Sequence, residues 1–468
     1  MRLSGFQLTD HPGDGSSWRT ALGMVAGLLG LVAAAALWGP DLFEGTAGDI
    51  DPMARFLIAV AVVLLVCHVL GELLRRIGQP PVLGEILGGL LLGPSALGLA
   101  WPQASAWLFR PDVLGHLDKA AQLGLVIFMF LLGCELRTDS LRGPRVLGSV
   151  VAGSMGLPLL AGMGFALVAS GTLAGPVGAG SGTYVLFVGL ALAITAMPVL
   201  ARILVDLRMD TTPVGAIALS AAAIGDGVAW TVLAVILAAA DLSGTGHLIT
   251  TAGLAVAFVL FIVLCVRPAL AALDRYTSRQ NGRGDGHADG GQVMLAVLVV
   301  GAFGAGAATE LIGLHPIIGA FLFGVVVPRR SPAVHQLSRR MQGFTLAILL
   351  PLFFGGVGLS TSVALLGSTP SHWLVFLGVL LIAVVTKFLG AGGGARLAGL
   401  PTGDALKIGT LMNCRGITEL VVATIGLHYG LINQLGFTIL VLVAVITTAA
   451  TGPLMRVLNR RDALPAGP

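Results

Sequence analysis

The chain is a succession of long apolar segments, most of them close to the roughly twenty residues that a helix needs to cross a bilayer. A bilayer core offers the backbone no hydrogen-bond partners, so segments of this kind fold as helices. Their approximate spans are 19–38, 54–74, 79–97, 116–134, 145–170, 182–205, 213–240, 248–271, 291–309, 311–328, 343–360, 372–395, 404–427 and 434–457. We therefore predict an all-α polytopic membrane protein with 13–14 transmembrane segments.

The composition supports this prediction. Of the 468 residues, 56% are hydrophobic and only 11% are charged, whereas soluble domains average about 25% charged. The mean hydropathy is +0.93, and the 67 glycines suit the close helix packing found in membranes. The basic residues lie mainly in the loops, so the sequence pI of about 9.1 does not indicate nucleic-acid binding.

Neither cysteine nor histidine forms a ligand pattern for a metal or a cofactor. The four cysteines fall in or beside apolar segments without a CxxC pair, and none of the nine histidines forms an HExxH motif. We therefore expect no disulfide framework, no metal centre and no cofactor.

The basic residues also give an orientation. Of the 27 Lys and Arg residues, all but five fall in one set of alternate loops, which we predict to be cytoplasmic because cytoplasmic loops are enriched in these residues. The exceptions are Arg55, Arg110, Lys119, Lys387 and Arg415. Both termini are then cytoplasmic. If segment 19–38 is a cleaved signal peptide rather than a retained helix, the mature N-terminus faces outward.

The polar linker at 272–290 divides the chain into similar halves. The expected regions are an N-terminal extra segment or signal-like region at 1–53, a transmembrane domain at 54–457 with repeat halves 54–271 and 291–457, and a short cytoplasmic tail at 458–468. Pro81–Gly88 parallels Pro316–Phe323, and Phe130–Leu136 parallels Phe353–Leu359. The charge pattern gives the first pair opposite orientations, which is typical of the inverted repeats of secondary transporters.

Asp226 lies near the middle of segment 213–240, about 20 Å from either end of a helix of that length. A carboxylate at that depth marks an ion or proton pathway more often than a structural ion pair. It can hold either a proton or a cation, and that competition couples the two ions. We therefore take Asp226 as the candidate ion- and proton-binding residue, with a structural carboxylate as the alternative.

Other polar residues deep in the predicted segments are candidates for the same ion site. Pro198 interrupts one segment, and Asn413, Gly416 and Thr418 interrupt another, so we predict two helices that break in mid-membrane. The candidate backbone and hydroxyl contributors to an ion site are Thr195, Ala196, Pro198, Asn413 and Thr418. The candidate counter-charges are Lys387, Arg415 and Glu419. The alternatives are a snorkelling Lys387 and a purely structural Arg415–Glu419 pair at i, i+4 spacing.

Several motifs resemble those of a known family. Pro80–Ser95, Thr195–Leu204, Ser220–Asp226 and Met412–Leu420 are similar to monovalent cation/proton antiporters, especially Kef-type transporters and plant cation/H+ exchangers. The resemblance covers about residues 55–457. It implies two inverted repeats, two crossed discontinuous helices, and a core domain that moves against a dimerisation domain, hence a homodimer.

The same resemblance assigns roles to single residues. The ion-carrying Asp of the family falls on Asp226, and its membrane-buried Lys falls on Lys387. Where the family usually has Asn or Asp before the carrier, this chain has Gly225, which leaves one carboxylate at the site.

We therefore expect a transporter in the cell membrane, not an enzyme, that exchanges Na+ or K+ for H+ by alternating access. A non-transporting or channel-like ion sensor is the alternative, because Gly225 departs from the family pattern. An intramembrane aspartyl protease is a weaker one, because that chemistry needs two carboxylates in one site and residue 223 is Ala.

Overall fold

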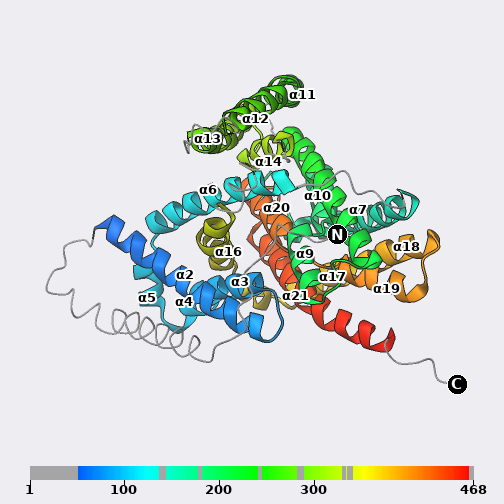
Figure 1. Ribbon diagram of the computed structural model, residues 1–468. Helices are drawn as coiled ribbons and strands as arrows, with labels where there is room; N and C mark the ends of the chain where they lie inside the picture. Colours follow the sequence, from blue (N-terminus) through cyan, green and yellow to red (C-terminus); the bar gives the residue numbers. More distant parts are fainter. Residues whose placement is uncertain are drawn as a thin grey trace, which may run out of the picture. The chain divides into compact units, whose positions relative to one another are not determined.

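The structure is a computed structural model that describes residues 51–135, 144–177, 182–240, 245–281, 289–328, 334 and 341–462. Over these residues it is built from helices (Figure 1). The α-helices are α2 (Pro52–Arg76), α3 (Pro81–Leu92), α4 (Leu97–Ala100), α5 (Pro102–Leu108), α6 (Pro111–Glu135), α7 (Pro144–Leu173), α8 (Gly182–Ala193), α9 (Met197–Asp206), α10 (Pro213–Ala240), α11 (Thr245–Phe261), α12 (Arg267–Asn281), α13 (Asp289–Ile312), α14 (Pro316–Val326), α16 (Leu350–Leu359), α17 (Pro370–Lys387), α18 (Gly393–Leu397), α19 (Thr402–Leu411), α20 (Ile417–His428) and α21 (Gln434–Asp462). Short π-helices cover Ile262–Val266, Thr345–Leu349 and Phe388–Gly392, and a 3-10 helix covers Val363–Gly367.

The protein is a multi-pass membrane protein. Eleven candidate spans in the described part of the chain are long and apolar enough to cross a bilayer, and α14 and α20 are shorter apolar helices. Predicted segment 213–240 coincides with α10. Predicted segment 19–38 lies outside the described residues.

Proline marks the start of many of these helices. Pro81, Pro316 and Pro370 each occupy the first turn of their helix. The missing N–H of proline costs nothing there, because the first turn has no intrahelical acceptor for it. These prolines therefore set where a span begins without weakening it.

The described chain forms two compact units. The first comprises residues 51–122 and 348–362, and the second comprises the rest. In the first unit, α3 packs against both α2 and α16. Its apolar core includes Val63, Cys67, Leu108, Val113 and Leu352.

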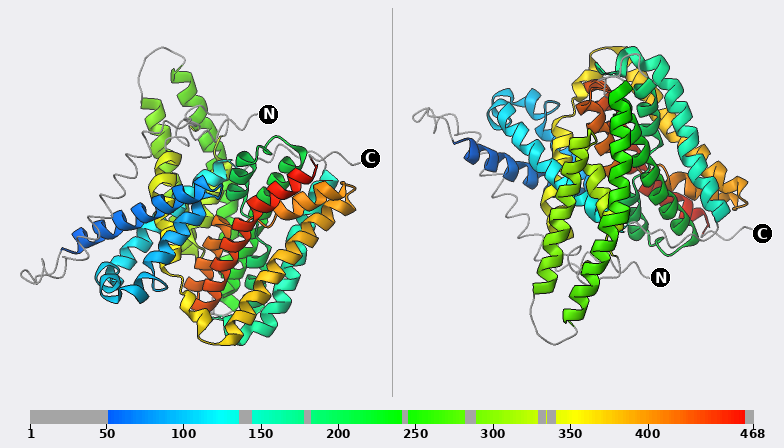
Figure 2. Two further views of the ribbon diagram at one scale, coloured as in Figure 1. Left: turned by 90° about the horizontal axis from the view of Figure 1, so that it is seen from below. Right: turned by 90° about the horizontal axis from the view of Figure 1, so that it is seen from above.

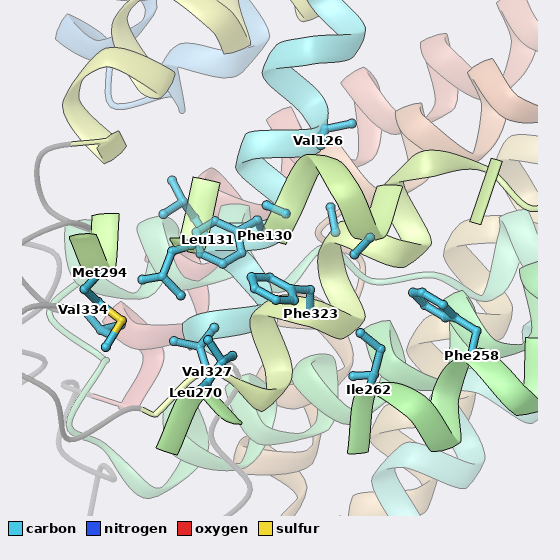
Figure 3. Close-up of a cluster of buried hydrophobic side chains, with 14 residues drawn as sticks. Val126, Phe130, Leu131, Phe258, Ile262, Leu270, Met294, Phe323, Val327 and Val334 are labelled. Atoms are coloured by element: carbon cyan, nitrogen blue, oxygen red, sulfur yellow. The ribbon is translucent and has the colours of Figure 1, made fainter. Parts of the chain in front are cut away.

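The second unit contains α6 from Leu123 onwards, the helices from α7 to α14, and those from α17 onwards. One of its cores gathers residues from α6, α11, α13 and α14, among them Phe130, Phe258, Met294 and Phe323 (Figure 3). Elsewhere in this unit, α7 runs beside α17 (Figure 2).

The expected internal repeat is visible in the glycine contacts. A Cβ atom on Gly84 of α3 would lie 2.3 Å from the backbone nitrogen of Gly71 in α2, and a Cβ atom on Gly319 of α14 would lie 2.1 Å from the carbonyl oxygen of Ala305 in α13. Any larger side chain would separate these helices. Corresponding helices of the two halves therefore use glycine for the same close approach.

The linker expected at 272–290 begins later than predicted. Helix α12 continues to Asn281, because no glycine or proline interrupts the sequence between Pro268 and that residue. Residues 282–288 lie outside the described residues, as do positions 1–50 and 463–468 of the two predicted terminal regions.

Candidate functional site

Two broken helices of the second unit meet at their breaks. Helix α8 ends at Ala193 and α9 begins at Met197, while α19 ends at Leu411 and α20 begins at Ile417. Between them, the Thr195 hydroxyl donates to the Met412 carbonyl at 2.9 Å and the Ala196 N–H donates to the Cys414 carbonyl at 3.2 Å. Each unwound segment thus satisfies backbone groups that the other has freed, as irregular backbone inside a membrane requires.

Local sequence explains where the first break falls. Pro198 is the second residue of α9, where its missing N–H costs nothing, but in a continuous helix its ring would clash with the preceding turn and a donor would be lost. In the second break, the Asn413 side chain donates to the Gly409 carbonyl at 2.9 Å and so caps the end of α19. Both breaks lie where the sequence predicts them.

Asp226 faces the start of α9. One oxygen of its carboxylate, Oδ2, accepts the Met197 N–H at 3.2 Å. Asp226 is only 3% exposed. A negative charge is stabilised at this position because a helix N-terminus carries a partial positive charge. The other oxygen, Oδ1, is buried and has no hydrogen-bond partner among the described residues.

Two further buried oxygens belong to the second broken helix. The Thr418 hydroxyl lies beside the Asp226 carboxylate, although no hydrogen bond of standard geometry joins them. Asn413 Oδ1 is likewise buried and without a hydrogen-bond partner in the described part of the chain. Buried polar atoms rarely stay unpaired, so these oxygens are suited to a bound ion.

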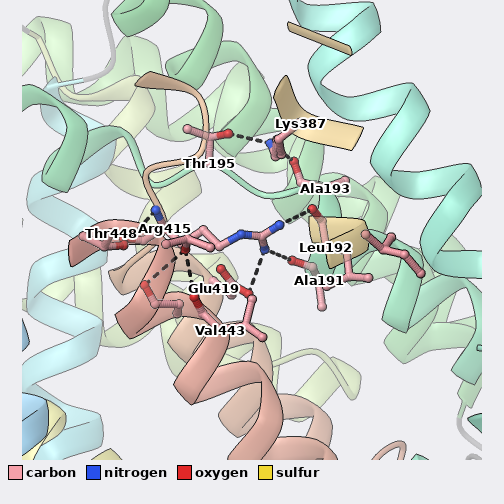
Figure 4. A network of polar contacts seen from close by, with 12 residues as sticks. Ala191, Leu192, Ala193, Thr195, Lys387, Arg415, Glu419, Val443 and Thr448 are labelled. Atoms are coloured by element: carbon pink, nitrogen blue, oxygen red, sulfur yellow. Dashed lines mark hydrogen bonds and ion pairs between the residues drawn. The ribbon is translucent and has the colours of Figure 1, made fainter. Parts of the chain in front are cut away.

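The end of α8 is covered by two cationic side chains (Figure 4). Lys387 Nζ donates to the Ala193 carbonyl and to the Thr195 hydroxyl, both at 2.5 Å. Arg415 donates to the Ala191 carbonyl at 3.1 Å and to the Leu192 carbonyl at 2.7 Å. Three consecutive carbonyls at the negative end of the α8 dipole are therefore bound by positive charge.

Lys387 owes its position to unusually close helix packing. It is the last residue of α17, and the π-helix Phe388–Gly392 follows it directly. There, a Cβ atom on Gly153 of α7 would lie 2.0 Å from the carbonyl oxygen of Gly390. Both hydrogen bonds of the ammonium go to neutral oxygens, so pairing of Lys387 with Asp226 stays a prediction.

Arg415 and Glu419 form the ion pair that their spacing suggests, with 2.8 Å between Nη1 and Oε1 and both side chains fully buried. The pair does not lie on one intact helix, however. Helix α20 begins at Ile417, so Arg415 belongs to the unwound segment. The pair joins this segment to the first turn of α20.

Some members of this network are not evident from the sequence. Thr448 of α21 forms hydrogen bonds with both the N–H and the carbonyl of Arg415. Thr447, Thr448 and Thr451 interrupt the apolar stretch between Ile439 and Met455, which is the sequence signal that could have pointed to Thr448. The carbonyls of α8 carry no side-chain signal at all.

Crossed, broken helices around a buried carboxylate are a feature of secondary transporters. The family described as "Sodium/hydrogen exchanger, transmembrane" matches residues 58–458. The chain therefore belongs to this transporter family.

Similar proteins agree with this assignment. The Na(+)/H(+) antiporter NhaS4 of Synechocystis sp. is 32% identical over 87% of this chain and 98% of its own length. Cation/H(+) antiporter 19 of Arabidopsis thaliana is 34% identical over 86% of this chain and 49% of its own length, so the chain spans about half the length of this plant relative. The matched family and these relatives are cation/proton antiporters.

The fold has a solved counterpart. The sodium proton antiporter MjNhaP1 of Methanocaldococcus jannaschii matches with a TM-score of 0.57 over 86% of this chain and 96% of that chain. At 17% sequence identity, the likeness shows the fold: two inverted repeats with two crossed discontinuous helices.

Proposed function

We propose that this protein exchanges one monovalent cation, Na+ or K+, for one proton by alternating access, with Asp226 as the shared carrier. The observation that supports the proposal is the hydrogen bonding of the Asp226 carboxylate, of which one oxygen has a partner among the described residues and the other has none. Asp226 Oδ2 is bound to the Met197 N–H, and Oδ1 is buried without a partner among the described residues. A proton or a cation completes the same site, so the two exclude each other.

The cation would be bound by oxygens of both broken helices. Asp226 supplies the charge, and the buried oxygens of Thr418 and Asn413, which have no hydrogen-bond partner in the described part of the chain, are the candidates for further ligands. The Thr195 hydroxyl is less available, because it donates to the Met412 carbonyl and accepts from Lys387. Ala196 would contribute its carbonyl oxygen, because its N–H is a donor and already binds the Cys414 carbonyl. Pro198 contributes by fixing where α9 starts.

One carboxylate predicts electroneutral exchange. Lys387 and Arg415 bind carbonyls at the end of α8, and Glu419 pairs with Arg415, so in this proposal the charge of the moving site changes at Asp226 alone. A protonated and a cation-loaded Asp226 give the site the same net charge. The membrane potential then drives neither half of the cycle.

The names of the relatives favour a monovalent cation, but they include both sodium and potassium. The antiporter from Synechocystis sp. bears the name of a sodium antiporter, whereas a relative from Saccharomyces cerevisiae is named a K(+)/H(+) antiporter. Exchange should therefore be compared with Na+, K+, Li+ and Rb+ in proteoliposomes that contain a pH-sensitive dye.

Asp226→Asn tests the carrier. We expect it to abolish cation-driven proton flux while the purified protein keeps its elution profile and thermal stability, because asparagine preserves the hydrogen bond from Met197. Asp206→Asn is the matched control, because Asp206 is half-exposed at the end of α9 and pairs with Arg202. Flux that survives in Asp226→Asn would rule out this residue as carrier.

Gly225→Asp tests the stoichiometry. A Cβ atom there would meet only Met155 Sδ, at 3.6 Å, so the packing allows a side chain. We expect wild-type exchange to be insensitive to a clamped membrane potential, and exchange by Gly225→Asp to depend on it because a second carboxylate is present. Gly225→Asn, of similar size without the charge, should remain insensitive. Voltage-dependent exchange by the wild type contradicts the one-for-one cycle.

We further propose that the protein is a homodimer in the cell membrane with a cytoplasmic C-terminus. The asymmetry of basic residues between alternate loops supports this orientation. Labelling of a single cysteine placed near Arg456 by a membrane-impermeant reagent, in intact cells and in inverted vesicles, distinguishes the two sides.

A further inference from the structure

One side chain of α21 holds the unwound segment between α19 and α20. The Arg415 N–H donates to Thr448 Oγ1 at 3.0 Å, and the Thr448 hydroxyl donates back to the carbonyl oxygen of the same residue. Thr448 is 1% exposed and Arg415 is fully buried. Figure 4 shows Thr448 beside the Arg415 backbone, on the side away from the guanidinium.

These two bonds satisfy groups that have no helical partner. Arg415 lies between the end of α19 and the start of α20, and buried backbone groups in such a segment require partners from elsewhere. The neighbouring bonds, to the Met412 and Cys414 carbonyls, come from the other broken helix. Thr448 therefore connects this segment to α21.

The first half of the fold has a counterpart. There, Asp226 of α10 accepts the Met197 N–H at the start of α9. Helices α10 and α21 each follow the broken helix of their own half. Each contributes one side chain that binds backbone at the break: Asp226 binds the first residue of α9, and Thr448 binds Arg415 in the unwound segment. The difference is chemical: α10 provides a carboxylate and α21 provides a hydroxyl.

This difference matters during ion exchange. A carboxylate accepts a strong hydrogen bond while it is charged and a weaker one once it is protonated. A threonine hydroxyl neither gains nor loses charge at physiological pH. The bond at α9 therefore responds to the ion on Asp226, whereas the bonds at Arg415 do not.

We propose that Thr448 is a positioning residue that keeps the α19–α20 break fixed while protons and cations exchange at Asp226. The proposal rests on the proposed function. Asn413 and Thr418 lie within three residues of Arg415 and carry the unpartnered oxygens of the site. Loss of the Thr448 bonds frees this segment and places those oxygens less well for a cation.

Two threonines of the same helix are matched controls. The Thr447 hydroxyl donates to the Val443 carbonyl at 2.8 Å, and the Thr451 hydroxyl donates to the Thr447 carbonyl at 2.9 Å. These are ordinary bonds to the preceding turn. Both residues are as buried as Thr448, so their substitution by valine reports the effect of losing a hydroxyl from α21 without disturbing the break.

The test compares Thr448→Val, Thr448→Ser and Thr447→Val in proteoliposomes that contain a pH-sensitive dye, with the cation concentration varied. In Thr448→Val we expect the half-saturating cation concentration to rise about tenfold, because both hydrogen bonds that hold the Arg415 backbone are lost. The maximal rate should stay within about twofold of wild type. Thr448→Ser keeps the hydroxyl and should restore wild-type saturation, and Thr447→Val should match wild type.

Unchanged saturation in Thr448→Val, or an equal change in Thr447→Val, overturns the proposal. A lower maximal rate with unchanged saturation also overturns it, because it indicates a purely structural role. If Thr448→Val does not fold, Thr448→Ser and Thr448→Ala provide the same comparison of hydroxyl against none. Absence of exchange in the wild type instead contradicts the proposed function, so the two failures are distinguishable.

Discussion

The buried Arg415–Glu419 pair allows a prediction about the free energy of unfolding of its single and double variants. Arg415 has two kinds of partner: the Glu419 carboxylate at 2.8 Å and the carbonyls of Ala191 and Leu192 at 3.1 and 2.7 Å. Both charged side chains are fully buried. Removal of one member of such a pair typically costs about 3–5 kcal/mol, because the other charge is left buried without compensation.

The two single variants should therefore differ. Glu419→Gln leaves the guanidinium bound to the two carbonyls, so we expect a loss of about 3 kcal/mol in the free energy of unfolding. Arg415→Met leaves the Glu419 charge unpaired and also leaves two carbonyls without a donor, at about 1 kcal/mol or more each. We expect a loss of about 5 kcal/mol for this variant.

The double variant Arg415→Met, Glu419→Gln removes both charges and leaves only the unpaired carbonyls. Its expected loss is about 2–3 kcal/mol, so it should be more stable than Arg415→Met alone. The assay is unfolding by SDS in mixed micelles, followed by tryptophan fluorescence. Additive losses, with the double variant less stable than either single variant, would refute the argument that the pair is coupled by burial.

Two further predictions concern the ends of helices. Arg208, just past the end of α9, has a φ of 54°, a conformation that costs a non-glycine residue about 1 kcal/mol or more. Arg208→Gly should therefore raise the free energy of unfolding by about 0.5–1 kcal/mol after the entropy of glycine is subtracted. A lower thermal stability in this variant would contradict the prediction. His315 accepts the Ile317 N–H at 3.4 Å and so caps the start of α14. His315→Ala should therefore lower the free energy of unfolding by about 1 kcal/mol, whereas His315→Asn keeps an acceptor at the cap and should lose less; equal losses of thermal stability in the two variants would contradict a capping role.

Hydropathy and charge predicted most of the fold, because both follow directly from the bilayer. A span must be apolar over its full length, so the limits of α10 agree with predicted segment 213–240. The breaks were predictable for a similar reason. Pro198 and the polar run that begins at Asn413 cannot continue a helix without loss. The structure unwinds just before α9, whose second residue is Pro198, and between Leu411 and Ile417.

The partners of the deep charges were not predictable in the same way. Lys387 binds oxygens about 190 residues away in sequence, and no local pattern determines how a helix is rotated about its axis. Its position depends on the contact between Gly153 and Gly390, which sequence presents only as two glycines among 67. Thr448 was missed because threonine in a membrane helix usually bonds to its own preceding turn, as Thr447 does.

The placement of these charges makes the two breaks electrostatically unequal. At the first break, Lys387 and Arg415 bind the carbonyl end of α8, and Asp226 binds the N–H end of α9. At the second break, the backbone groups bound by Thr195, Ala196 and Thr448 have neutral partners, and the charged Arg415 and Glu419 side chains pair with each other. In the proposed cycle, neutralisation of Asp226 by a proton therefore weakens its bond with the Met197 N–H at the start of α9, while the cations at α8 keep their partners. Movement that follows the ion on Asp226 should begin at α9.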